Sequence, residues 1–284
     1  MLDFSIIDCH NHSIPYIDDG AENMDMALAM LQIASDSGTS DVILTPHHLN
    51  GAFSNGAEHV LKHFNALVLE TSKNNISINL HYGSEVHLVS ETVEHIVSQK
   101  ALTYCGLGKA ALIELPKNSI PNGVERILSE LIYNGISPII AHPERNSALR
   151  RDQTPLMEWI EFGCKSQLTG QSCTGEFGTE LQEISFKMIE QGLVHIVASD
   201  AHRPTGRTPD LSRAAEVLIE LFDIETAKMF LHDNPKRLID GQDLLSYKPQ
   251  CNRPETGTNQ KKHQQTKKTP KRKKTILQRL IEFR

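Results

Sequence analysis

Residues 5–12 read Ser-Ile-Ile-Asp-Cys-His-Asn-His. Their two consecutive isoleucines predict a short buried β-strand that ends near Asp8. His10 and His12 are two positions apart, and such positions in an extended chain project to the same face. A strand that leads directly into two imidazoles is typical of a parallel α/β protein, in which polar residues gather where the strands end.

Six further strand-like runs follow this first one, and segments with helical spacing of apolar residues separate most of them. The seven strands are expected at residues 5–8, 41–45, 76–82, 110–115, 138–141, 165–169 and 194–199. Gly38, Gly135 and Gly192 are expected to mark the ends of three helices. The alternation predicts a parallel α/β fold. We favour a TIM-like (β/α)7 barrel over an open doubly wound sheet, because no G-x-G-x-x-G motif follows the first strand.

The composition changes abruptly near residue 247 of the 284. Residues 1–247 hold 17 Lys and Arg against 33 Asp and Glu, a formal charge of −16, whereas residues 248–284 hold 12 basic and 2 acidic residues, a charge of +10. We therefore predict one folded domain over 1–247. A basic disordered linker is expected over 248–275 and a short amphipathic helix over 276–284.

Composition also excludes several classes of protein. The acidic body argues against nucleic-acid binding, because affinity for the phosphate backbone comes from Lys and Arg. No stretch approaches the ~18 consecutive apolar residues of a transmembrane helix, and the N-terminus lacks the pattern of a secretory signal. The five cysteines are scattered and form no C-x-x-C motif. We therefore expect a cytoplasmic protein without a disulfide framework or a thiolate zinc site.

Imidazoles and carboxylates follow the ends of six of the seven predicted strands. They are His10, His12, one of Asp18 and Asp19, one of His47 and His48, Glu85, Glu114, His142, Asp200 and His202. Polar groups at the carboxyl ends of barrel strands converge on one rim, so these residues are expected to share a site. Imidazole and carboxylate without thiolate suit Mn, Fe, Zn or Mg. The set exceeds the ligands of one ion and predicts two or three, an arrangement suited to phosphoryl transfer.

The combined motifs D-x-H-x-H, D-D-G, T-P-H, G-x-E, I-E-L, A-H-x-E-R and A-S-D-x-H resemble those of the PHP superfamily (polymerase and histidinol phosphatase). More closely, they are similar to the bacterial tyrosine-protein phosphatases of capsular and exopolysaccharide gene clusters, from residue 7 to about residue 239. The resemblance implies a distorted seven-stranded α/β barrel with a trinuclear metal centre. We expect up to three divalent ions, with Mn²⁺ preferred and Fe, Zn or Mg as alternatives.

The resemblance also implies a role for individual residues. One ion would be held by His10, His12, Glu85 and Asp200, a second by Glu114 and His142 with Glu85 bridging, and a third by Asp19, His47 and His202. The two phosphate-binding arginines of the family match Arg145, in A-H-P-E-R, and Arg207, in H-R-P-T-G-R. A guanidinium suits this role because it is planar, permanently charged and able to bind phosphate through two hydrogen bonds.

The activity implied by the resemblance is metal-dependent hydrolysis of phosphotyrosine on the tail of a membrane-associated tyrosine autokinase. No cysteine is followed by five residues and an arginine, so a cysteine-dependent phosphatase is excluded. A small-molecule phosphoesterase such as a histidinol-phosphate phosphatase, a nuclease and a non-catalytic metal-binding regulator remain alternatives. The complete set of ligands and arginines argues against the regulator.

The basic segment 248–284 is the main departure from the resemblance. A polybasic stretch followed by an apolar helical face is typical of an anchor to anionic membranes. We therefore expect a cytoplasmic enzyme that is peripheral at the inner membrane, and the alternative is a solvated extension without a role. Nucleic acid is the least favoured partner, because the segment lacks interleaved aromatic residues for base stacking.

Overall fold

The computed structural model describes residues 2–250, and its strands all pair in parallel. They are β1 (Ile6–Asn11), β2 (Thr39–Leu44), β3 (His47–His48), β4 (Asn79–Tyr82), β5 (Glu85–His87), β6 (Ala110–Glu114), β7 (Ser137–Ala141), β8 (Lys165–Thr169) and β9 (Ile196–Ala198). Hydrogen bonding groups them in the orders β1-β2-β4 and β3-β5-β6-β7-β8-β9. Each of the seven predicted strands therefore has a counterpart. The second and third strand positions also continue, after a split, into the short strands β3 and β5, which lie beyond the predicted runs 41–45 and 76–82.

Backbone hydrogen bonds continue across both splits. Pro46 interrupts the second strand because proline has no N–H to donate, yet its carbonyl accepts from the amide of Glu85 at 3.1 Å. The amide of Gly83, in the break of the third strand, donates to the carbonyl of Leu44 at 2.8 Å. The two ladders thus form consecutive parts of one curved wall of seven strand positions.

The first and last strands close this wall into a barrel. The amide of Asp200 donates to the carbonyl of His10 at 2.8 Å, and the amide of His12 donates to the carbonyl of Ala201 at 2.9 Å. The buried carboxylate of Asp8 reinforces the seam, because it accepts from the amide and the hydroxyl of Ser199 at 2.9 and 2.6 Å. The expected seven-stranded α/β barrel is therefore confirmed.

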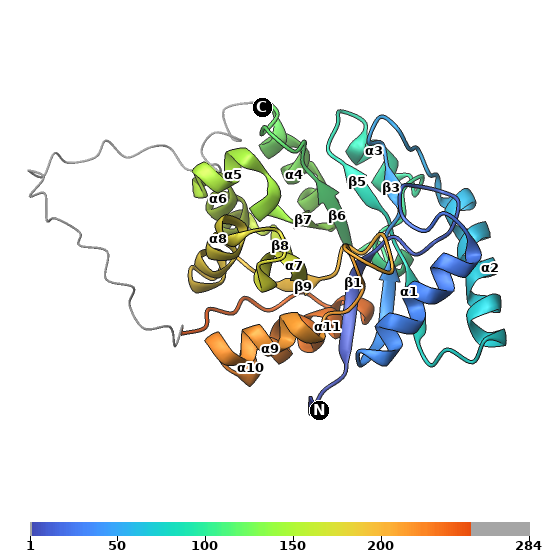
Figure 1. Cartoon of the computed structure of the whole chain (residues 1–284). Helices are drawn as coiled ribbons and strands as arrows, with labels where there is room; N and C mark the ends of the chain where they lie inside the picture. Colours follow the sequence, from blue (N-terminus) through green and yellow to red (C-terminus); the bar gives the residue numbers. More distant parts are fainter. Residues whose placement is uncertain (1, 251–284) are drawn as a thin grey trace, which may run out of the picture. The chain divides into compact units, whose positions relative to one another are not determined.

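Helices surround the strands (Figure 1). They are α1 (Met24–Asp36), α2 (Ala57–Lys73), α3 (Thr92–Val97), α4 (Val124–Tyr133), α5 (Ser147–Arg151), α6 (Thr154–Phe162), α7 (Gly170–Thr174), α8 (Thr179–Glu190), α9 (Ser212–Leu221), α10 (Ile224–Lys228) and α11 (Asn234–Ile239), with 3-10 turns η1 (Tyr104–Gly106) and η2 (Pro143–Arg145) and a π-helical turn η3 (Met229–Asp233). Helices α1, α4 and α8 end as predicted, each two residues before Gly38, Gly135 or Gly192 at positive φ.

Alternate residues of the strands face two parts of the apolar core, one inside the barrel and one between the barrel and the helices. Leu112, Ile139 and Ile196 pack with Ile7 and Ile43 from other strands, and this cluster fills the barrel. Their immediate neighbours Ile113, Ile140 and Val197 instead belong to the cluster formed with helices such as α4 and α8. Apolar packing on both faces of the strands holds their carboxyl ends in fixed positions.

Part of the sequence-based expectation lies outside the described residues. The predicted helix over 276–284 and nearly all of the predicted linker over 248–275 fall there. Within residues 2–250, the structure has no helix with the length and hydropathy needed to cross a membrane.

Candidate metal centre

The nine predicted ligands come together where the strands end. His10 lies in β1, His47 in β3, Glu85 in β5 and Glu114 in β6, and the other five lie in the loops that follow the strands. Their ligand atoms form four groups within 4.8 Å: His12, Asp19, His47 and His202; His10, His12 and Glu85; His10, His142 and Asp200; and His47, Glu85 and Glu114. Every ligand that the resemblance implied is thus in a group, and several residues belong to two groups.

Local backbone irregularities aim these side chains. The register of β1 against β2 shifts between Asp8 and Asn11, at the D-x-H-x-H motif, and such bulges are common beside active sites because they redirect side chains. His142 and Asp200 both have positive φ, 30° and 51°. Non-glycine residues in this region cost energy, and they cluster where function requires a particular geometry.

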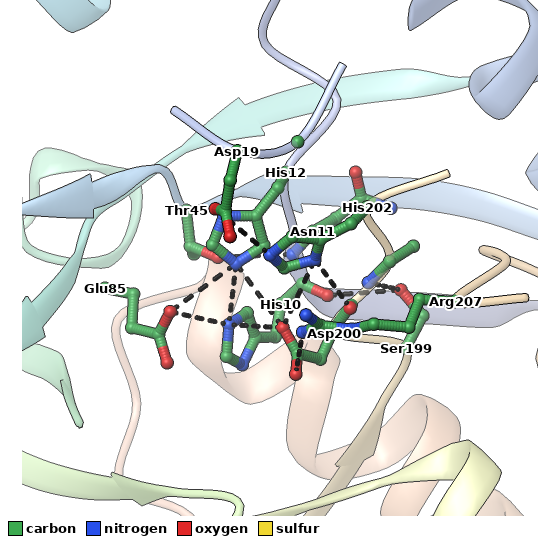
Figure 2. A network of polar contacts seen from close by, with 12 residues as sticks. His10, Asn11, His12, Asp19, Thr45, Glu85, Ser199, Asp200, His202 and Arg207 are labelled. Atoms are coloured by element: carbon green, nitrogen blue, oxygen red, sulfur yellow. Dashed lines mark hydrogen bonds and ion pairs between the residues drawn. The ribbon is translucent and has the colours of Figure 1, made fainter. Parts of the chain in front are cut away.

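The rings of His10 and His12 lie beside the carboxylates of Glu85 and Asp200 (Figure 2). Hydrogen bonds to Nδ1 fix the orientation of both rings. His10 Nδ1 donates to the side-chain carbonyl of Gln167 at 2.9 Å, and the Gln167 amide is oriented by its own bond to a backbone carbonyl. His12 Nδ1 donates to Asp18 at 2.8 Å. Each imidazole therefore directs Nε2 into the site, as metal-binding histidines do.

The two Nε2 atoms lie only 3.1 Å apart. Two facing lone pairs repel each other, so the contact requires a positive charge between or beside them. Without a cation a proton supplies it. Burial lowers the pKa of His12, but the charge of Asp18 and the hydrogen bonds with Asp18, Asp200 and Glu85 together outweigh burial and raise that pKa well above its usual value. A divalent ion would take the place of this proton, which is the usual coupling of metal binding to proton release.

Four buried atoms of the candidate ligands make no hydrogen bond: His47 Nδ1, Glu85 Oε2, Asp200 Oδ1 and His202 Nε2. Glu85 Oε2 nevertheless lies 2.9 Å from His47 Nδ1 and 3.3 Å from His10 Nε2. Buried polar atoms without partners cost about 1–3 kcal/mol each. Lone pairs that converge without hydrogen bonds fit divalent cations, so the residues present suit the metal that the resemblance implied.

Two buried carboxylates in the centre of the site carry negative charge. Burial raises the pKa of Glu85, but His10 and His47 outweigh it and hold that pKa well below its usual range. Burial likewise raises the pKa of Asp200, but His10 and Arg207 outweigh burial and hold that pKa well below its usual range. Both groups are therefore ionised, which suits candidate ligands rather than proton donors.

The group of His12, Asp19, His47 and His202 contains the one exposed member of the set. Asp19 Oδ1 lies 3.4 Å from both His47 Nε2 and His202 Nε2, and the Asp19 side chain is 54% exposed. Burial and the nearby positive His12 lower the pKa of His202 to about 4, so its imidazole is neutral at pH 7. Burial lowers the pKa of His47, but Glu85 raises it to about 10. This group therefore opens toward solvent, where an ion or a substrate can enter.

Arg145 and Arg207 converge on one atom. Each donates to Asp200 Oδ2, and each side chain is 30% exposed. Arg145 lies in η2 directly after His142, and Arg207 lies in the loop between β9 and α9. The structure thus brings both predicted arginines to the carboxylate at the centre of the site, with part of each guanidinium facing solvent.

Several residues of the site were not predicted. Gln167 orients His10, Asp18 orients His12, and His87 bonds Glu114 at 3.0 Å. Arg203 donates to the backbone carbonyls of Asp19, Gly20 and His202, and so ties the loop after β1 to the loop after β9. Only the D-D-G motif contained a signal for any of them, because it placed Asp18 beside the chosen Asp19.

The buried Glu144 was also missed. It accepts from the amide of Thr169 at 3.0 Å and from the hydroxyl of Ser172 at 2.8 Å. These bonds tie the A-H-P-E-R motif to the end of β8 and to α7. Glu144 thereby holds the backbone that carries His142 and Arg145.

Comparison with known proteins shows the family. The sequence profile described as "Capsular polysaccharide synthesis, CpsB/CapC" matches residues 6–240, which contain the barrel and every residue of the site. The chain belongs to the CpsB/CapC family. Its members include the tyrosine-protein phosphatase YwqE of Bacillus subtilis, which is 34% identical over 245 residues, 86% of this chain and 96% of YwqE.

Solved structures support the same assignment. A structure from a study of YwqE and of CpsB from Streptococcus pneumoniae, described as unique metal-dependent tyrosine phosphatases, superposes with a TM-score of 0.82 at 32% identity. It covers 88% of this CpsB/CapC chain and all of that chain. A phosphotriesterase homology protein from Escherichia coli superposes with a TM-score of 0.51 at 12% identity over 82% of this chain and 98% of its own. This second likeness concerns the barrel fold alone.

Proposed function

We propose that this protein is a metal-dependent protein-tyrosine phosphatase, which converts phosphotyrosine and water to tyrosine and phosphate. The observation that carries the proposal is the convergence of nine candidate ligands and two arginines on buried, unpartnered carboxylate and imidazole atoms. Membership of the CpsB/CapC family and the similarity to YwqE give the substrate class.

The donor set indicates which ions the site would hold. Imidazole and carboxylate ligands without thiolate favour Mn²⁺, with Fe, Zn or Mg as alternatives. We propose up to three ions: one at His10, His12, Glu85 and Asp200, one at Glu114 and His142 with Glu85 shared, and one at Asp19, His47 and His202. Bound ions of this kind lower the pKa of water toward ~7 and neutralise the charge of a phosphoryl group.

The chain's own residues position the phosphate. Arg145 and Arg207 share Asp200 Oδ2 and are partly exposed, so each guanidinium can turn remaining N–H groups toward phosphate oxygens. Charge in phosphoryl transfer spreads over the equatorial oxygens, and cations held near those oxygens stabilise the transition state. Arg203 acts indirectly, because it holds the backbone that carries Asp19 and His202.

The site favours an aromatic leaving group. Its imidazoles and carboxylates are the candidate ligands, which leaves them poorly placed to serve also as strong proton donors. Phenolate, with a pKa of ~10, leaves with little protonation. A serine alkoxide is far more basic, so we expect phosphotyrosine to be hydrolysed in preference to phosphoserine.

The first experiment compares initial rates on a phosphotyrosine peptide for the metal-replete protein, the EDTA-treated protein and Arg145→Ala. We expect turnover to require metal and to fall ~100-fold or more in Arg145→Ala, since one electrostatic contact to a transition state contributes about 2.7–4 kcal/mol. Arg126→Ala is the matched control, because Arg126 is 80% exposed on α4 and pairs only with Glu130 in the described structure.

Each other outcome selects an alternative. Cleavage of histidinol phosphate or another small ester, with the peptide untouched, would replace the tyrosine phosphatase by a small-molecule phosphoesterase. Cleavage of single-stranded DNA alone would indicate a nuclease. A protein that binds metal but cleaves none of these substrates would be a regulator.

We further propose that the natural substrate is the phosphotyrosine-bearing tail of a membrane-associated tyrosine autokinase in capsule or exopolysaccharide synthesis. The family description supports the pathway. The charge of +10 over residues 248–284 supports a location at an anionic membrane surface. We expect full-length protein to sediment with anionic liposomes and the chain ending at residue 247 to stay in solution; equal sedimentation would contradict the role of the segment.

A further inference from the structure

Phe177 stands at the edge of the metal centre without belonging to it. It lies in the short connection between α7 and α8, which leaves the barrel after β8. The amide of Gly178 donates to the carbonyl of Gly175 at 2.9 Å, and both glycines have positive φ, 96° and 85°. Phe177 is therefore at the tip of a defined tight turn, and its side chain is only partly buried.

The ring of Phe177 lies against the guanidinium of Arg145, with 5.6 Å from Arg145 Cζ to the ring centroid. This is a cation–π distance. The same guanidinium donates to Asp200 in the centre of the site. The Phe177 ring thus contacts an arginine that also reaches the centre of the site. Because the ring is partly exposed, a second aromatic group can pack against it.

The other aromatic side chain near the centre has a different setting. Phe53, in the loop after β3, is nearly parallel to the imidazole of His47, at 8° and 6.3 Å between centroids. The β3 position and the β8 position are separated by at least two strands in either direction around the barrel. Phe53 therefore covers a candidate metal ligand, whereas Phe177 lies beside a candidate phosphate ligand.

We infer that Phe177 is a specificity-determining residue that packs against the tyrosyl ring of the substrate. The inference rests on the proposed function, because it takes Arg145 as a phosphate ligand. The aryl group of a phosphate ester is joined to the phosphate through a single oxygen, so a phosphate bound by Arg145 places its ring close to the guanidinium. Aromatic pairs form at centroid distances of 4.5–7 Å, and the Phe177 ring is within this range of the guanidinium itself.

The competing explanation is that Phe177 only supports Arg145. In that case its removal would weaken binding of every phosphate group equally, whatever group the phosphate carries. If Phe177 contacts the substrate ring, its removal would weaken only ligands that have a ring. The two explanations therefore differ in a ratio of affinities rather than in the loss of activity.

The experiment measures the dissociation constants of phenylphosphonate and methylphosphonate by titration calorimetry on the metal-replete, full-length protein. Both ligands present the same anionic head and resist hydrolysis. We expect wild-type protein to bind phenylphosphonate more tightly. Phe177→Leu should lower that preference about three- to tenfold, the contribution of one aromatic pair, and leave methylphosphonate binding unchanged.

Two further variants make the result specific. Phe177→Tyr keeps the aromatic face and should retain the preference, while Tyr133→Ala removes an aromatic side chain that is 87% exposed on α4 and should change neither constant. Equal weakening of both ligands in Phe177→Leu, an unchanged ratio, or a wild type without preference would each overturn the inference. Failure of the proposed function is recognised separately, as absence of phosphotyrosine hydrolysis by wild-type protein.

Discussion

His10 and His12 direct Nε2 into the site because other side chains hold Nδ1. Gln167 and Asp18 supply these bonds, at 2.9 and 2.8 Å. Asp18 is the more consequential of the two, since it also accepts from the backbone amide of His47 at 3.1 Å. One carboxylate thus orients two candidate ligands from different strands.

Asp18→Asn is expected to weaken metal binding about 10- to 100-fold, the usual cost of removing a hydrogen-bond partner of a ligand. An amide of the same shape carries no charge, so it no longer increases the basicity of His12. Competition with a fluorescent chelator measures the affinity. Asp25→Asn, an exposed position in the first turn of α1, is the control; equal affinities in the two variants would show that Asp18 does not act on the metal.

The sequence predicted the candidate ligands better than the residues that orient them. Glu85 and Asp200 occur in motifs at strand ends, and a strand end can be recognised from the sequence alone. Gln167 lies within a predicted strand and is an amide, so nothing in the sequence connects it with His10, 157 positions away. The bond of His87 to Glu114 could not be predicted either, because it depends on the pairing of β5 with β6.

At the level of elements, the loop between β1 and α1 must pass very close to the strand it leaves. A Cβ atom on Gly20 would lie 2.0 Å from the carbonyl oxygen of His12 and 2.9 Å from Asp18 Oδ1. The same carbonyl accepts the amide of Ala21 at 2.9 Å. Only glycine permits this approach, which lets Asp18 reach His12 Nδ1 and Asp19 reach His47 Nε2 and His202 Nε2.

Gly20→Ala is therefore expected to displace the loop, destabilise the fold by about 1–3 kcal/mol and reduce metal content. Urea denaturation and elemental analysis of the purified protein measure the two effects. Gly56→Ala is the matched control. Gly56 has a φ of −66°, which any residue can adopt, and the nearest atom to a Cβ added there is 3.9 Å away. Full metal content in Gly20→Ala would mean that the loop is not part of the centre.

The sequence predicted some boundaries of helices and strands correctly and others not. Three helix ends were predicted correctly, because a glycine at positive φ is a local signal. The split between β2 and β3 was not predicted, although the sequence contains Pro46. A proline lacks an N–H, but whether this breaks a strand depends on which neighbouring strand would accept the missing hydrogen bond. The run over 76–82 was expected to be one strand, and only Asn79–Tyr82 pairs within it.

At the scale of the whole molecule, the site combines many buried polar atoms at one end of an apolar barrel. Their unmet interactions reduce the stability of the metal-free protein. A ligand that binds only the folded state stabilises it, by about 2.7 kcal/mol at one hundred times its dissociation constant.

We therefore expect Mn²⁺ at that concentration to raise the Tm of EDTA-treated protein by about 5–10 °C, given about 2–4 °C for each kcal/mol in a protein of this size. Thermal scans followed by circular dichroism measure the shift. The variant His12→Ala should shift less than wild type, and Ca²⁺, which prefers oxygen ligands, is the control ion. Identical melting with and without Mn²⁺ would contradict the presence of a metal centre in the fold.

The seam between Asp8 and Ser199 has a consequence for biosynthesis. The two residues are 191 positions apart, so a ribosome has produced most of the barrel before β1 meets its last neighbour. Until then one side of β1 is an unpaired edge, which invites association with other chains. His10 and His12 leave the ribosome long before Asp200 and His202. The nascent chain thus cannot present the candidate ligands as a complete set until the ring of strands has closed.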